Sequence, residues 1–217
     1  MYLGTDFHRY WARCGKDNIH PDDLPILKSN SPFNHELLPC PFDGPLEKAK
    51  VIICLANPSD GYEQDIKRVN EFALSMRSGE EPLPSIFNEF YERIVGPLRI
   101  PIDDLGSLVA VFNVCPYTSK DMKPSIARKA AGLPSVWQAQ KYLREVLIPR
   151  AQTGNIYLIL IRKLQLWGVT QGAADHGGLR VIPNLAISGV MSNELGKEIR
   201  AWLVKKGHIT NVNKCES

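Results

Sequence analysis

Three short runs of continuous apolar residues set the main constraint on how this chain folds. They cover residues 49–56 (AKVIICLA), 107–115 (SLVAVFNVC) and 155–161 (NIYLILI). A strand buried on both faces is apolar throughout, whereas a strand with one face in water alternates apolar and polar residues. The three runs therefore predict central strands of a parallel sheet that is covered on both sides.

Segments with apolar residues at helical spacing separate these strands. One such segment ends near Met76, and another runs from Pro134 to Ile148. A weaker fourth strand is expected at residues 179–186, before a terminal helix that starts near Asn193. Because strands and helices alternate, we expect an α/β fold, a three-layer α/β/α sandwich with a central, mostly parallel four-stranded sheet.

With 217 residues, the chain is long enough to bury a core without help from disulfides or metal. We expect a single domain over residues 1–217. Within it, residues 1–45 form an N-terminal helix and an irregular, proline-rich wrap, residues 46–207 form the α/β core, and residues 208–217 form a tail. Long irregular segments inside a compact domain are often functional, so we expect the wrap to cover or line the site.

Composition narrows the class of protein. The five cysteines are odd in number and scattered, which argues against a disulfide framework and favours a reducing cytoplasm. The longest apolar runs are too short to cross a bilayer, so we expect a cytoplasmic monomer without membrane contact. No C-x-x-C pair occurs and the histidines lack metal-ligand spacing, so no metal or other cofactor is expected. The formal net charge of +3 permits contact with a polyanion.

Polar residues follow the predicted strands at the edge where a site is expected. In an open parallel sheet, ligands bind beyond the carboxyl ends of the strands. Here those ends carry Asn57, Asn113, the pair Arg162-Lys163, and a segment from Asn184 to Asn193. An amide offers a donor and an acceptor side by side, so amides at three of the four ends suggest recognition of a flat, hydrogen-bonding heterocycle.

Two motifs at these ends resemble those of a known family. They are Ala-Asn-Pro-Ser at residues 56–59 and Phe-Asn-Val-Cys-Pro-Tyr at residues 112–117. Both are similar to motifs of the uracil-DNA glycosylase superfamily, most closely its single-strand-selective monofunctional branch. The resemblance extends over residues 48–206 and implies that family's fold. In the family, the first motif reads Gly-x-Asn-Pro or Gly-x-Asp-Pro and positions the attacking water, and the second supplies the Asn that recognises the flipped base.

The resemblance implies a monofunctional hydrolase that cleaves the bond between a base and its sugar in DNA, without a metal. Asn57 would orient water, and Asn113 would recognise the Watson–Crick edge of the flipped base. Ala56 and Pro58 would line the base site, and Phe112 or Tyr62 would stack on the ring. An enzyme of this kind stabilises a base anion and places water beneath the sugar.

Two departures from the family pattern bear on the substrate. Leu55 stands where the family has Gly in the first motif. The family's last motif begins His-Pro-Ser, whereas here the corresponding segment is 184–193 and contains no histidine. Asn184 or Ser188 would then take the catalytic place of that histidine. We therefore expect a damaged or modified pyrimidine, met in DNA repair or in defence against phage DNA, in place of ordinary uracil.

Contacts to the DNA backbone are expected from the basic and polar residues around these ends. The residues concerned are Lys120, Lys123, Arg162, Lys163, Ser192 and Asn193. Simpler structural interpretations stand beside these assignments. An Asn-Pro pair is typical of a turn, a buried Asn often bonds to nearby backbone, and aromatic residues often fill the core. Exposed cations are typical of a solvated surface, and a Ser before a helix is typical of a cap.

Two other functions fit the same residues. One is a catalytically inactive relative that binds nucleic acid, and salt-dependent DNA binding without base release would identify it. The other is an enzyme that acts on a free nucleoside or nucleotide, which suits the modest net charge. A thermal shift with nucleosides, without DNA binding, would identify that class.

Overall fold

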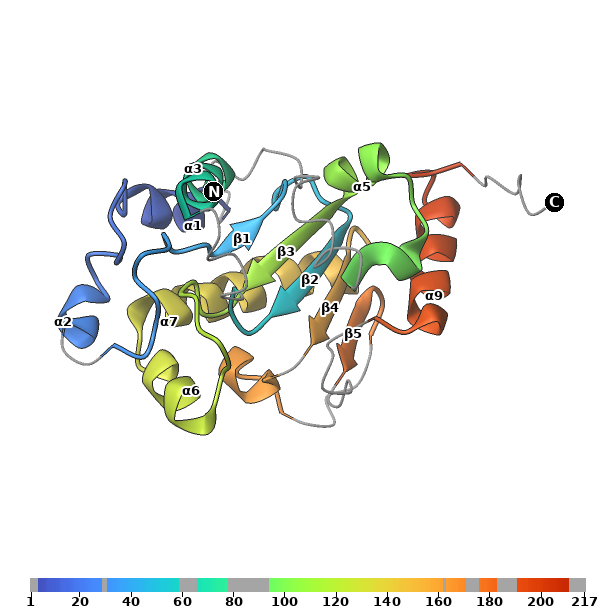
Figure 1. The fold of residues 1–217 in the computed structure, drawn as a ribbon. Helices are drawn as coiled ribbons and strands as arrows, with labels where there is room; N and C mark the ends of the chain where they lie inside the picture. The colour runs from blue at the N-terminus through green and yellow to red at the C-terminus, as the bar shows by residue number, and fades with distance from the viewer. Residues whose placement is uncertain are drawn as a thin grey trace.

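The computed structural model of the protein describes residues 4–28, 31–58, 66–77, 94–161, 163–170, 176–182 and 191–210. Within these residues, one five-stranded sheet has the strand order β1-β3-β2-β4-β5 (Figure 1). The strands are β1 (Phe42–Asp43), β2 (Val51–Leu55), β3 (Val109–Asn113), β4 (Tyr157–Ile161) and β5 (Leu179–Ile182). Neighbours from β3 through β5 pair in parallel, whereas β1 pairs antiparallel to β3.

The structure confirms the predicted α/β class and the four parallel strands. It adds β1, which comes from the proline-rich wrap and places Phe42 opposite Phe112. This strand has two residues and lies between prolines at positions 41 and 45, so it is too short for an alternating pattern to reveal. The last part of the predicted fourth strand, residues 183–186, lies outside the described residues.

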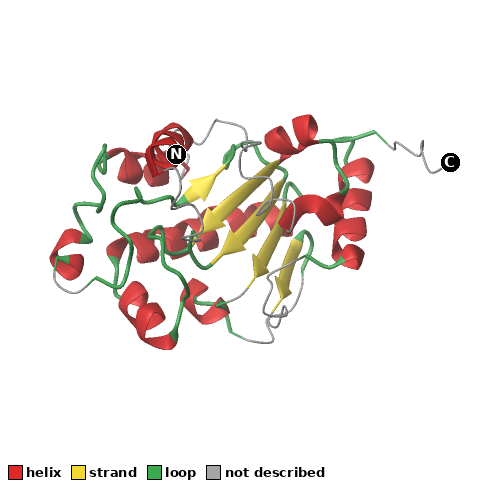
Figure 2. Cartoon of the chain, in the orientation of Figure 1, coloured by secondary structure: helices red, strands yellow, loops and turns green. Residues whose placement is uncertain are grey.

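Helices lie on both sides of the sheet (Figure 2). The first face is covered by α1 (Gly4–Ala12), α6 (Pro124–Ala131), α7 (Pro134–Tyr142), the π-helical turn η4 (Leu143–Leu147), α8 (Ile148–Gln152) and the 3-10 helix η5 (Leu164–Trp167). The second face is covered by the 3-10 helix η3 (Gly96–Leu98), α5 (Ile102–Leu108) and α9 (Asn193–Lys205). Two further helices, α2 (Leu24–Leu27) and α3 (Ile66–Met76), lie in the wrap and beside β1.

Each face of the sheet has its own hydrophobic core, which explains why the strands are apolar throughout. On the first face, alternate strand residues pack against a group of aromatic side chains that includes Phe7, Tyr142 and Trp167. On the second face, the remaining strand residues pack against Leu98, Ile199 and other apolar side chains. Since strand side chains alternate between faces, both layers of helices are needed to bury each strand.

The predicted helix at residues 134–148 reaches further and is not regular. Three segments continue one another from Pro134 to Gln152, with the π-helical turn in the middle. Pro149 lies in the last segment and has no backbone N–H to donate to the preceding turn. A widened turn just before the proline accommodates that loss. Three α-helices, α2, α5 and α6, were not predicted, because their segments are short. The predicted second strand began at Ser107, whereas Ser107 and Leu108 end α5 and the strand starts at Val109.

The wrap is tied to the core by the buried carboxyl group of Asp23. The Tyr117 hydroxyl donates to Asp23 Oδ2 at 2.6 Å, and the Ser135 backbone N–H donates to Asp23 Oδ1 at 3.0 Å. The His20 backbone N–H donates to the Tyr117 oxygen at 3.1 Å. Burial and the neighbouring Asp23 raise the pKa of Tyr117, so its hydroxyl stays protonated as a donor. One side chain therefore joins the wrap, the segment after β3 and the N-terminus of α7.

In the part of the chain that the structure describes, none of the helices combines the length and the apolar character required to cross a membrane.

Candidate functional site

The two motifs lie next to each other at the carboxyl edge of the sheet, because β2 and β3 are neighbouring parallel strands. The last pair in their register joins Leu55 to Asn113. Pairing continues past the strands, where the Val114 N–H donates to the Leu55 carbonyl at 3.1 Å and the Cys115 N–H donates to the Ala56 carbonyl at 2.9 Å. The two motifs, which are far apart in the sequence, therefore lie side by side at the edge where ligands bind in sheets of this kind.

Within the described part of the chain, the backbone N–H and the side-chain Nδ2 of Asn113 are hydrogen-bonded, whereas its amide oxygen Oδ1 is not. Its side chain is 2% exposed. Its backbone N–H donates to the Pro41 carbonyl at 2.8 Å, and its Nδ2 donates to the Cys40 carbonyl at 3.1 Å. Among the described residues, no group donates to Oδ1, although that atom is buried. A buried acceptor without a partner costs about 1–3 kcal/mol, so a donor supplied by a ligand would relieve this cost.

Asn57 is oriented by its neighbours in a similar way. Its Nδ2 donates to Ser119 Oγ at 3.0 Å and to the Pro58 carbonyl at 2.8 Å. Ser119 Oγ in turn donates to the Asp121 carbonyl at 2.9 Å. Within the described residues, no group donates to Asn57 Oδ1. Asn57 as a residue is half-buried, and its two Nδ2 hydrogen bonds fix the direction of the amide. Ala56 and Pro58, the predicted lining residues, are also half-buried.

Phe112 does not have the predicted stacking role. Its side chain is fully buried on the first face of the sheet, in contact with the rings of Phe7 and Trp167 at centroid distances of 5.5 and 5.1 Å. Successive strand residues point to opposite faces, so Phe112 points away from the side of Asn113. The simpler interpretation, that Phe112 fills the core, is confirmed.

The wrap supports the site, as expected from its length. Cys40 and Pro41 provide the two carbonyls that hold Asn113, and the Cys40 N–H donates to the Pro116 carbonyl at 2.8 Å. A further bridge pairs Asn34 with Thr118. Sequence reasoning missed Cys40 and Ser119 as positioning residues. Backbone carbonyls leave no residue-specific signal, and a single serine in a polar loop has none either.

The two thiols near the site are held in the protonated form. Cys40 Sγ donates to Asp43 Oδ1 at 2.9 Å, and burial together with Asp43 raises the pKa of the Cys40 thiol well above its usual range. Burial raises the pKa of Cys115 to about 12. A thiol is a weak nucleophile and a poor metal ligand until it is deprotonated. Neither cysteine therefore suits nucleophilic catalysis at neutral pH.

Comparison with known proteins does not assign this chain to a family. No family model, no curated protein and no solved structure matches it. Among the described residues, no group of three or more His, Cys, Asp or Glu side chains is arranged to hold a metal ion. The functional interpretation therefore depends on the geometry of the two amides.

The predicted backbone-contact residues have different surroundings. Lys120, Lys123 and Lys163 are all exposed, and Lys123 Nζ lies 3.2 Å from the Asp121 carboxylate. Ser192 Oγ accepts from the Leu195 N–H at 3.2 Å, so the cap interpretation of Ser192 is confirmed. Asn193, also exposed, is the first residue of α9. Lys123 is therefore paired with Asp121, and a phosphate contact by the exposed lysines stays a prediction.

Four predicted site residues lie outside the described residues: Tyr62, Arg162, Asn184 and Ser188. Two of them, Asn184 and Ser188, carry the catalytic role expected from the altered last motif, and Tyr62 carries the remaining stacking role. These assignments stay predictions.

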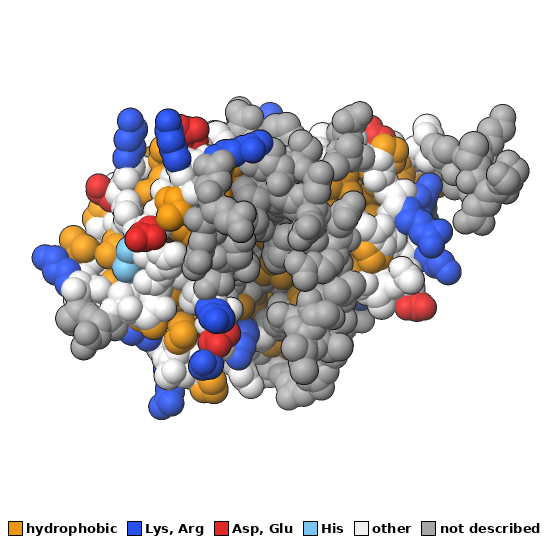
Figure 3. All heavy atoms as spheres, viewed as in Figure 1, with side chains coloured by type: hydrophobic (Ala, Val, Ile, Leu, Met, Phe, Trp, Pro, Cys, Tyr) orange, Lys and Arg blue, Asp and Glu red, His pale blue; other side chains and the backbone are white. Residues whose placement is uncertain are grey.

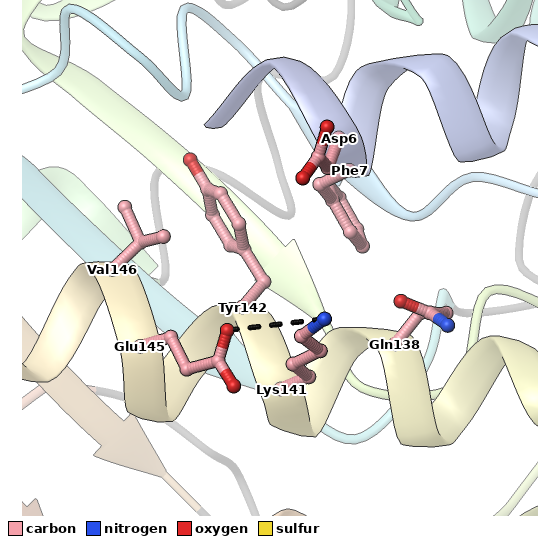
Figure 4. A pocket seen from close by; sticks show the side chains of 7 residues that line it. All are labelled: Asp6, Phe7, Gln138, Lys141, Tyr142, Glu145 and Val146. Atoms are coloured by element: carbon pink, nitrogen blue, oxygen red, sulfur yellow. Dashed lines mark ion pairs between the residues drawn. The ribbon is translucent and has the colours of Figure 1, made fainter. Parts of the chain in front are cut away.

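A hollow between α1 and α7 offers no alternative site for a heterocycle. It is lined on one side by Phe7 and on the other by Lys141, Tyr142 and Glu145 (Figure 4). The rings of Phe7 and Tyr142 stack there at a centroid distance of 4.7 Å. The cavity has a volume of about 20 Å³, which suits a single water molecule.

Proposed function

We propose that this protein is a DNA glycosylase-like enzyme that hydrolyses the bond between sugar and base at a damaged or modified pyrimidine flipped out of DNA. Neighbouring strand ends carry the two amides that such a reaction uses. The observation that carries the proposal is the buried, unpartnered Oδ1 of Asn113 at the carboxyl edge of the sheet. On this proposal the protein has the uracil-DNA glycosylase-like fold and acts on DNA in the cytoplasm.

The arrangement of the Asn113 amide favours a base edge that presents a donor beside an acceptor. Its Oδ1 needs a donor, and its Nδ2 uses one of two hydrogens on the Cys40 carbonyl. The second hydrogen remains for an acceptor on the ligand. A ring N–H beside a carbonyl, as in uracil and its derivatives, presents this donor and acceptor side by side. Cytosine also carries a donor, its exocyclic amino group, beside the acceptor of its ring nitrogen, so the oligonucleotide panel distinguishes the two bases.

Asn57 is suited to hold water in place. An amide oxygen accepts one hydrogen bond from water and so fixes the direction of the water's lone pair. A neutral amide is a poor general base, so its contribution is one of orientation. Stabilisation of the departing base then depends on hydrogen bonds to the base, which include the one from Asn113.

The experiment is a panel of oligonucleotides, single-stranded and duplex, each with one uracil or modified pyrimidine. After incubation and alkali treatment, strand breaks report base release. We expect release from at least one modified base, slowed about 100-fold in Asn57→Ala because a misplaced water loses its attack geometry. Asn155→Ala is the matched control, since Asn155 is an exposed amide just before the amino end of β4.

Two results would contradict the proposal. One is intact strands across the whole panel with the unaltered protein. The other is equal rates for the unaltered protein and Asn57→Ala. Retained DNA binding with no release in any sample would identify the inactive relative in place of the enzyme.

A further inference from the structure

A group of cations on the outer side of α9 was not part of the sequence-based assignments. Lys197, Arg200 and Lys205 line a surface hollow of about 350 Å³ together with Ala201 and Val204. Figure 3 shows Lys and Arg side chains gathered along the right edge of the molecule, where α9 lies in Figure 1. We call Lys197, Arg200 and Lys205 the α9 stripe.

The α9 stripe carries charge that the described part of the protein does not neutralise. Its three residues form no ion pair with any described carboxylate. The acidic side chain nearest the middle of the helix, Glu198, is bonded to the Tyr157 hydroxyl at 2.9 Å and to Arg180. Among the described residues, the stripe therefore carries positive charge that no ion pair neutralises.

The helix that carries the stripe is firmly seated. A Cβ at Gly196 would lie 2.3 Å from the Pro97 carbonyl oxygen, so α9 and η3 are in direct backbone contact. Arg200 Nη1 donates to the Arg99 carbonyl across this contact. Cations on a fixed surface lose less entropy on binding than cations on a loop.

The spacing of the stripe suits a phosphate backbone. Lys197 and Lys205 are eight positions apart on one helix, which is about 12 Å at 1.5 Å per residue. That length corresponds to about three base pairs of duplex DNA, which carries one phosphate per 3.4 Å on each strand. A regular polyanion can therefore meet several cations of the stripe at once.

We propose that the α9 stripe is a contact surface for the nucleic-acid backbone. It lies on α9, apart from the paired strand ends that carry Asn57 and Asn113, and it binds phosphates without regard to sequence. This inference goes beyond the proposed base release and does not require it. In contrast to the predicted contacts at Lys120 and Lys163, it places cations along a helix on the second face of the sheet.

The test compares two charge-reversed double variants by fluorescence anisotropy with a short labelled duplex across a range of salt concentrations. Lys197→Glu/Lys205→Glu alters the α9 stripe. Lys16→Glu/Lys28→Glu is the matched control, because both of its lysines are exposed residues in other parts of the chain and the change in net charge is the same. We expect the α9 variant to bind at least about tenfold more weakly, with the slope of log K against log salt reduced by about 2, one unit per lost contact.

The inference is overturned if the unaltered protein does not bind the duplex, if both variants change equally, or if neither changes. A competition experiment with polyglutamate tests whether the stripe prefers an acidic polypeptide. We expect the protein to bind DNA more tightly than polyglutamate. A preference for polyglutamate would assign the stripe to an acidic protein. The anisotropy assay measures DNA binding and does not depend on base release. A protein that releases no base would therefore count against the proposed function, while the salt dependence of its binding would still test the α9 stripe.

Discussion

Replacing Asp23 by alanine is expected to lower the free energy of unfolding by about 3–5 kcal/mol. The carboxyl group is fully buried and accepts from the Tyr117 hydroxyl and the Ser135 N–H. Each donor would lose its buried partner at a cost of about 1–3 kcal/mol, and α7 would lose the group that caps its first turn. Equilibrium denaturation in urea, followed by circular dichroism, measures the change.

Asp22→Ala is the control for this prediction. Asp22 is adjacent in sequence, but its carboxylate pairs with Arg13, which is largely exposed, so its loss is expected to cost less than about 1 kcal/mol. Equal losses for the two variants would show that Asp23 does not join the wrap to the core in the way the structure indicates.

Gly196→Ala is expected to destabilise the protein by about 1–2 kcal/mol. In an ordinary helix interior the same change stabilises by about 1 kcal/mol, because alanine is the better helix former. Here the new Cβ would lie 2.3 Å from the Pro97 oxygen and 2.6 Å from the Pro97 carbonyl carbon. Both are backbone atoms, so α9 would have to move away from η3, and overpacking of this kind costs about 1–3 kcal/mol.

Gly96→Ala is the matched control on the other side of the same contact. In the part of the chain that the structure describes, a Cβ at Gly96 meets no atom within 4 Å, and its backbone is not left-handed. Thermal unfolding of both variants is expected to give a lower Tm for Gly196→Ala and an unchanged or higher Tm for Gly96→Ala. A Gly196→Ala variant as stable as the unaltered protein would rule out the close contact between α9 and η3.

The parallel strands were predictable because burial on both faces leaves a continuous apolar signature, as in residues 155–161. The short edge strand Phe42–Asp43 was not, because two residues between prolines carry no period. The helix Pro124–Ala131 also escaped prediction. Its charged last turn and small apolar residues resemble a polar loop until α7 and η5 pack against it.

At the candidate site, the positions of the amides were predictable and their surroundings were not. Asn57 and Asn113 each follow or end an apolar run, and neighbouring parallel strands bring such ends together. The partners that orient them come from elsewhere, namely the Cys40 carbonyl in the wrap and the Ser119 hydroxyl in the loop after β3. The predicted stacking role of Phe112 is wrong because successive strand residues point to opposite faces, which places Phe112 in the core and Asn113 on the other side.

The central claim is that Asn113 binds the flipped base while Asn57, at the neighbouring strand end, holds water beside it, and side-chain amide resonances in 1H–15N NMR test it most directly. The protein is titrated with a uracil-containing or modified-pyrimidine oligonucleotide, and an otherwise identical unmodified oligonucleotide is the control. We predict that both amide signals shift with a common midpoint on binding of the modified strand, while the signal of Asn155 does not move. The account would be contradicted if neither amide signal shifts, or if both shift equally with the unmodified strand.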